Sequence, residues 1–240
     1  MTVLSALIDV TVRGMLGRRR SIVMLFLAAI PVLLGVIVSL RGGRVDVDRV
    51  LGVLIVQTVL PLIALILGTA SLGSEIEDGT IVFLLIKPIK RWVVAFSKVL
   101  VAVAATTFLV VPVTILTGVL ISGTDPANLQ TTFAFAIACA AGGAAYAAVF
   151  VALSSLTARA LLAGLVYVLL WEGALGGLLE GTRFLSIRQA TLGIVAGLGG
   201  GHERDPIQAG VAAAVITVAI VASLAITAWR LARFEVRGGD

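Results

Sequence analysis

The sequence has very little cysteine and little charge. Of its 240 residues only Cys139 is a cysteine, and Asp, Glu, Lys and Arg together make up 13%. A single cysteine excludes a small secreted domain held together by disulfides. Low charge with 60% hydrophobic residues excludes an intrinsically disordered chain. A mean hydropathy of +1.14 excludes a soluble globular domain as well, so the sequence predicts an integral membrane protein.

Long apolar runs take the place of the missing charge. A helix that crosses a bilayer needs about 20 mostly apolar residues. Six runs meet this requirement, at residues 21–40, 50–73, 99–121, 131–153, 160–180 and 210–229. Because lipid offers no partner to unpaired backbone groups, we predict an all-α bundle of six transmembrane helices that forms a single domain over residues 1–240.

The lysines and arginines are unevenly divided between the two sides of this bundle. Counted over the connections, 12 lie on the side of the two termini and 6 on the other side. The positive-inside rule then places both termini in the cytoplasm of a multi-pass protein of the cell membrane. The net charge of +5 therefore reflects orientation, and we expect no nucleic-acid partner.

Two further segments flank the spans. Apolar residues recur at near-helical spacing between Leu4 and Leu16, which predicts an amphipathic N-terminal helix lying in the cytoplasmic interface. The outer connection at residues 181–208 is too apolar to float freely and too short for two spans, so we predict a short re-entrant or interfacial helix there. His202, Glu203 and Asp205 of this connection are expected to be solvated surface, and no metal site is predicted.

Glu172 is the only acidic residue inside a predicted span. An ionisable group at that depth costs roughly 2.5–3.5 kcal/mol or more, so it must face a cavity or a partner. Two interpretations remain open. Glu172 either lines or gates a transport pathway, or it forms a structural hydrogen bond that caps the outer re-entrant segment.

The fourth predicted span is rich in small residues. Residues 138–148 are almost entirely alanine and glycine, with Ala138 and Gly142, and Gly143 and Ala147, four residues apart. This spacing is typical of helices that approach each other closely in a membrane.

The connection at residues 74–98 changes sign along its length. Acidic residues open it, an apolar run follows at residues 80–86, and basic residues close it. Such a run is costly in water at about 25 cal/mol per Å², so we expect it to lie under the bundle or against a partner protein. The plainer interpretation is a charged loop that satisfies the positive-inside rule.

The residues of this connection form a recognisable pattern. An acidic residue, Glu75, is followed by Glu77, Gly79–Thr80, Leu84–Leu85, Pro88, Arg91 and Lys98. This resembles the cytoplasmic loop of type-2 ATP-binding cassette (ABC) exporter permeases, whose subunits have six spans and cytoplasmic termini. The resemblance covers the whole chain in span count and is strongest over residues 71–98.

The resemblance implies that the chain is the permease subunit of an ATP-driven exporter. It would form the translocation pathway as a dimer, with a second copy or a similar chain, and two ABC ATPase subunits would drive it. The loop would be the coupling helix that docks on the ATPase, through the residues Glu75, Glu77, Asp78, Phe83, Leu84, Lys87 and Arg91.

The chain has no phosphate-binding loop of the type GxxxxGK[ST]. We therefore expect it to bind no cofactor directly and not to be an enzyme, with ATP and Mg bound by the partner ATPase. An importer-type ABC permease and a membrane scaffold without transport activity remain as alternatives. An intramembrane enzyme is not favoured, because the sequence has neither HExxH nor GxSxG.

Overall fold

The computed structural model describes seven stretches of the chain, residues 18–41, 45–77, 91–123, 125–157, 159–175, 185–201 and 206–233. All regular structure within them is helical. The prediction of an all-helical fold is thus confirmed for the described residues. The amphipathic helix predicted at the N-terminus lies outside these stretches.

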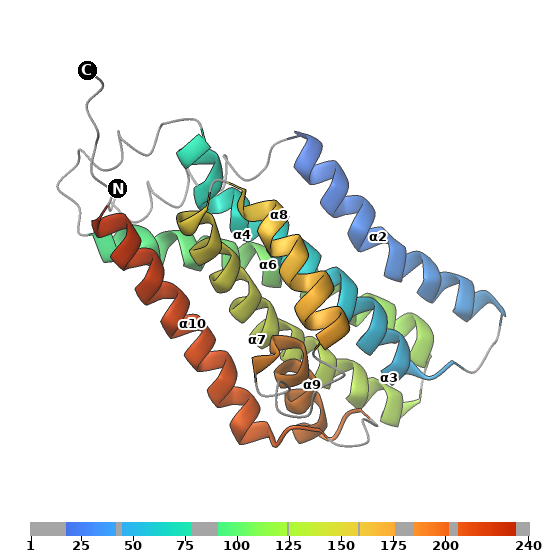
Figure 1. Ribbon diagram of the computed structural model, residues 1–240. Coiled ribbons are helices and arrows are strands. Elements are labelled where there is room, and N and C mark those ends of the chain that lie inside the picture. Colours follow the sequence, from blue (N-terminus) through green and yellow to red (C-terminus); the bar gives the residue numbers. More distant parts are fainter. Residues whose placement is uncertain are drawn as a thin grey trace, which may run out of the picture.

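Successive long helices run in alternating directions along one bundle, so that α2 begins and α10 ends at the same end of it (Figure 1). A short helix, α9, packs at the opposite end. In chain order the elements are α2 (Arg18–Arg41), α3 (Val47–Val50), the π-helix η1 (Leu51–Val59), α4 (Leu60–Glu77), α6 (Arg91–Ser122), α7 (Pro126–Leu156), α8 (Ala160–Val166), the π-helix η2 (Tyr167–Leu175), α9 (Ile187–Gly197) and α10 (Ala209–Ala232).

Among the described residues, five helices are long and apolar enough to cross a membrane. They correspond to five of the six predicted spans. The remaining one, predicted at residues 160–180, is represented by the shorter pair α8 and η2, of seven and nine residues. Residues 176–184 follow outside the described stretches, so the sixth span stays a prediction.

Both flanking helices extend into the connection predicted at residues 74–98. α4 continues to Glu77 and α6 already begins at Arg91, so only residues 78–90 separate the two helices. The prediction ended the connection at Lys98 because a charged residue is costly in lipid. Lys98 is instead fully buried inside the protein, where it does not meet lipid.

Three helices meet where this connection joins the bundle. A small apolar cluster holds the end of α4, the beginning of α6 and the end of α10 together, through Leu72, Val94, Ala95 and Leu231. The two helix ends that flank the connection are therefore packed against each other and against α10.

α7 runs through the middle of the bundle (Figure 1). About two thirds of its span is buried (67%), against 22% for α2 and 17% for α10. Its small residues let the neighbouring helices come close, and a side chain at Gly142 would overlap Thr191 of α9. The close helix packing predicted for this stretch is therefore confirmed.

We expect Gly142→Ala to loosen the contact between α7 and α9. The added Cβ would collide with the side chain of Thr191, whose hydroxyl donates to the carbonyl of Ile187 at 2.8 Å. Overpacking of this kind typically costs about 1–3 kcal/mol. Thermal unfolding of the purified protein in detergent measures the effect.

Gly52→Ala is the matched control for this substitution. Nothing lies within 4 Å of a Cβ at Gly52, and alanine favours a helix over glycine by about 1 kcal/mol. The expected melting temperature is unchanged or higher in this variant. A Gly142→Ala protein as stable as the Gly52→Ala protein would show that the contact with α9 is not tight.

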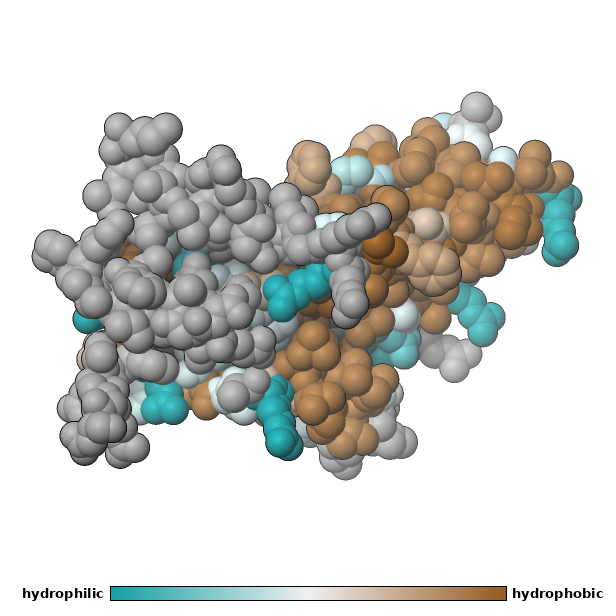
Figure 2. All heavy atoms as spheres, turned by 90° about the horizontal axis from the view of Figure 1, so that it is seen from above, coloured by the Kyte–Doolittle hydropathy of each residue, from teal (hydrophilic) through white to brown (hydrophobic). Residues whose placement is uncertain are grey.

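The exterior of the described bundle is strongly apolar. Apolar side chains form broad continuous areas in Figure 2, with few hydrophilic ones between them. Phe26 on α2, Phe108 on α6 and Val218 on α10 are each at least 65% exposed. An apolar exterior of this extent is the surface expected to face lipid.

Candidate functional site

The main polar cluster inside the described bundle surrounds Glu172. This residue lies on η2, and its side chain is only 2% exposed. The acidic group is therefore withdrawn from lipid, as the sequence analysis required. One of its hydrogen-bond partners, Tyr167, lies on η2 as well. The others lie at the start of α9, whose first residue follows 15 residues later in the chain.

Both oxygens of the Glu172 carboxylate accept hydrogen bonds. Oε1 accepts from the Tyr167 hydroxyl at 3.1 Å and from the Ile187 amide at 3.0 Å. Oε2 accepts from the Ser186 hydroxyl at 2.6 Å and from the Arg188 amide at 3.4 Å. Four donors thus converge on one buried carboxylate.

The two backbone donors, Ile187 and Arg188, are the first residues of α9. The first amides of a helix have no partner within it, and the helix dipole favours a negative charge at this position. Glu172 therefore caps α9 from a different helix. The geometry matches the structural interpretation of Glu172, while its predicted role in a pathway or gate is a separate question.

Ser186 connects the cap to the helix itself. Its hydroxyl accepts from the Gln189 amide at 3.1 Å while it donates to Glu172. Serine is among the residues most favoured immediately before a helix, because its oxygen reaches the amide of the third helical residue. The Ser-x-x-Gln pattern at residues 186–189 is a sequence signal for this helix start that the sequence analysis did not use.

Aromatic side chains support the same site from α7. The rings of Tyr146 and Phe150 are stacked with centroids 6.0 Å apart, and Phe150 meets Tyr167 edge-on at 6.3 Å. Tyr167 in turn donates to Glu172. Tyr146 itself is fully buried.

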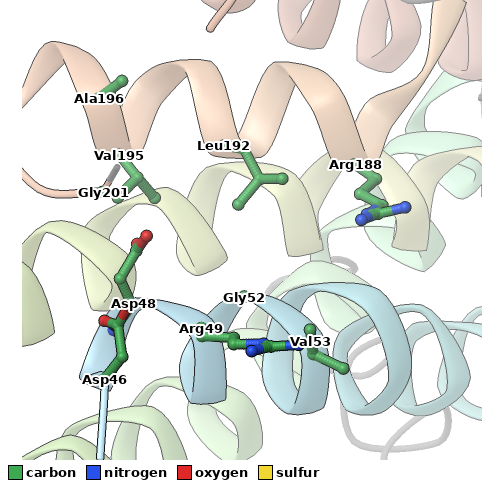
Figure 3. Close-up of a pocket in the computed structure, with 10 residues that line it drawn as sticks. All are labelled: Asp46, Asp48, Arg49, Gly52, Val53, Arg188, Leu192, Val195, Ala196 and Gly201. Atoms are coloured by element: carbon green, nitrogen blue, oxygen red, sulfur yellow. The ribbon is translucent and has the colours of Figure 1, made fainter. Parts of the chain in front are cut away.

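A polar pocket of about 740 Å³ lies beside this cluster, between α9 on one side and α3 with η1 on the other (Figure 3). Arg188 belongs to both the pocket and the Glu172 site, because its NH1 group donates to the backbone oxygen of Glu172 at 3.5 Å. No pattern in the sequence indicates this pocket. Its walls come from segments more than 130 residues apart, which no local pattern connects.

The predicted ATPase-coupling residues lie mostly outside the described part of the chain. Glu75 and Glu77 are in the last turn of α4, and Arg91 is the first residue of α6. The Arg91 NH1 group is buried without a hydrogen-bond partner among the described residues. Outside the described stretches are Asp78, Phe83, Leu84 and Lys87, as are His202, Glu203 and Asp205.

Comparison with known proteins identifies the family. The family described as ABC-2 family transporter protein matches residues 28–236, which include most of α2 and all later described helices. No curated protein matches the chain. The family is a membrane component of transport that is not itself catalytic. Since the match covers most of the sequence, the chain belongs to the ABC-2 family of transporter proteins.

Proposed function

We propose that the chain is the permease subunit of an ATP-driven exporter, coupled to separate ATPase subunits through the connection between α4 and α6. Membership of the ABC-2 family is the observation that carries this proposal. The acidic, apolar and basic order of residues 75–98 supports export, because it resembles the coupling loop of exporter permeases.

The arrangement of the helices supports this position for the coupling loop. α4 ends and α6 begins at the same end of the bundle as the start of α2 and the end of α10 (Figure 1). The cluster of Leu72, Val94 and Leu231 joins three of these helices at that end. A displacement of the loop would therefore be transmitted to α4, α6 and α10 together rather than to one helix.

The packing of the bundle supports a dimer. The core around α7 is filled by fully buried side chains such as Phe135, Tyr146 and Phe150. Such packing leaves little room for a substrate within one bundle. We therefore place the translocation pathway between two permease subunits, as a homodimer or with a similar chain.

Glu172 would act on such a pathway through α9. Because its carboxylate holds the first turn of α9, any movement that separates η2 from α9 must break the three hydrogen bonds from Ser186, Ile187 and Arg188 at once. We propose that Glu172 sets the closed position of α9 at the outer end of the pathway.

Purification of the tagged full chain from its native membrane tests the proposed function. We expect a soluble ATP-hydrolysing subunit to co-purify with it, together with a second permease subunit. The complex should hydrolyse ATP only when Mg is present, since both would be bound by the ATPase. Recovery of the folded chain without any ATP-binding subunit would contradict the proposal.

The orientation of the chain is a separate prediction. Both termini and Lys90 should face the cytoplasm, while Asn128 and His202 should face outward, according to the 12 to 6 division of Lys and Arg. Single cysteines at these three positions, in a Cys139→Ala background, can be treated with an impermeant thiol reagent on intact cells. Asn128→Cys and His202→Cys should react, and Lys90→Cys should react only after the membrane is opened. If only Lys90→Cys were labelled on intact cells, the chain would have the opposite orientation in the membrane.

A further inference from the structure

The pocket between α3 with η1 and α9 has a division of charge that the proposed function does not use. Its lining includes two acidic residues, Asp46 and Asp48, and two basic ones, Arg49 and Arg188. Figure 3 shows the aspartates at the end of the pocket where Gly201 lies and both arginine side chains in the other half, with Arg49 reaching toward Val53 and Arg188 on the opposite wall. The pocket thus offers separate places for a positive and a negative group.

The arginine half has unused capacity to donate hydrogen bonds. Arg188 Nε is buried and has no hydrogen-bond partner among the described residues, and its NH1 makes only a long contact of 3.5 Å. Arg49 is exposed and comes from the facing wall. Two guanidinium groups on opposite walls repel each other, and a phosphate between them would accept hydrogen bonds from both.

The aspartate half suits an amine. Asp46 is exposed, and its Oδ1 accepts from the Asp48 amide at 3.1 Å. This hydrogen bond fixes the carboxylate at the start of α3. The Asp48 carboxylate lies against Gly201, where a Cβ would come 3.3 Å from its Oδ1. Carboxylates at this end would disfavour a purely anionic ligand and favour one that also carries an ammonium group.

The position of the pocket favours a lipid over a soluble solute. Val47 is the first residue of a candidate membrane span, and Arg49 lies only about 3 Å further along the helix at 1.5 Å per residue. If Val47–Gly73 crosses the membrane, Arg49 lies at the depth of the lipid headgroups. Apolar lining continues inward from there at Val53, which is 48% exposed, and at Leu192.

From these observations we propose that the pocket binds the headgroup of an amine-bearing phospholipid such as phosphatidylethanolamine. Arg49 and Arg188 would hold the phosphate, and Asp46 and Asp48 the primary ammonium group. The proposal concerns a lipid-binding site and does not depend on export, on the ATPase or on which side of the membrane α9 faces.

Native mass spectrometry of the purified full chain in detergent tests this site. Palmitoyl-oleoyl phosphatidylethanolamine, phosphatidylcholine and phosphatidylglycerol are titrated separately. Phosphatidylethanolamine should bind roughly tenfold more tightly than the other two, a difference of about 1.4 kcal/mol. Phosphatidylcholine has no N–H to donate to the aspartates, and phosphatidylglycerol has no ammonium group.

Two variants with a matched control make the test specific. Arg49→Gln should weaken phosphatidylethanolamine binding by about tenfold, whereas Arg41→Gln, an exposed arginine at the end of α2, should leave it unchanged. Asp46→Asn should weaken the preference over phosphatidylglycerol, since only Asp48 then faces the ammonium group, but keep the helix cap, because asparagine caps as well as aspartate. The second variant preserves the test if Arg49→Gln is poorly folded.

Soluble phosphoethanolamine separates the headgroup from the lipid. If it does not displace the lipid, the acyl chains contribute and the ligand is the lipid, as proposed. If it displaces the lipid at a similar concentration, the site recognises the same zwitterion from solution and the assignment to lipid is wrong. Equal binding of all three lipids, or unchanged binding by both Arg49→Gln and Asp46→Asn, would overturn the site itself.

Discussion

Replacement of Glu172 by leucine is expected to lower the stability of the protein more than the other single substitutions considered for the described core. Leucine fills a similar volume but leaves the four donors around the carboxylate without an acceptor. A buried unsatisfied donor costs about 1–3 kcal/mol, so a loss of about 3 kcal/mol or more is expected. At 2–4 °C per kcal/mol this lowers the melting temperature by roughly 6–12 °C.

Two substitutions calibrate this result. Glu172→Gln retains one oxygen but turns an amide NH2 group toward amide and hydroxyl donors, so it should lose an intermediate amount. Asp125→Ala removes another acidic cap, at the start of α7, where the side chain is exposed and accepts from the Ala127 amide at 3.1 Å. An exposed cap is worth about 1 kcal/mol, so this variant should lose the least.

The glutamine variant also tests the proposed role of Glu172 in the pathway. The measurement is ATP hydrolysis by the reconstituted complex, well below the melting temperature of each variant. If Glu172 sets the closed position of α9, Glu172→Gln should change the rate while Asp125→Ala leaves it unchanged. Melting and hydrolysis both equal to wild type in Glu172→Gln would remove the cap and the pathway role together.

The second large effect is expected at the coupling loop. Glu77→Lys reverses a charge where α4 ends, and Phe83→Asp places a charge in the apolar run at residues 80–86. The few residues that dominate an interface each cost about 2 kcal/mol or more of binding free energy when they are replaced, and we expect Glu77 and Phe83 to be among them. Each variant should therefore recover at most about a tenth of the ATPase subunit in co-purification.

Val45→Lys is the matched control for the coupling variants. It adds a positive charge at an exposed position just before α3, at the opposite end of the bundle. Its yield in the membrane and its recovery of ATPase should equal those of wild type. Normal ATPase recovery by both Glu77→Lys and Phe83→Asp would exclude the loop as the docking element.

Much of the helical framework could be predicted from the sequence because lipid imposes a simple rule. A run of about 20 apolar residues must be a helix, and the described part of the chain contains five such helices. The rule failed at the start of α6, where Lys98 interrupts the run. A search for uncharged runs cannot distinguish a lysine that would face lipid from one that is buried inside the protein, as Lys98 is.

The candidate sites were harder to predict, since their partners are distant in the chain. The depth of Glu172 identified it as a residue that needs partners, but its donors at residues 186–188 depend on how α9 folds back onto η2. The pocket of Arg49 and Arg188 likewise joins two helix ends that only the tertiary fold brings together.

The most direct measurement of the central claim is crosslinking from the coupling loop. A photo-reactive amino acid is placed at Phe83 or, as a control, at Val45, and the full chain is irradiated in its native membrane. We expect a crosslinked ATP-binding subunit from position 83 and none from position 45. A correctly inserted chain that traps no ATP-binding subunit at position 83 would contradict the claim.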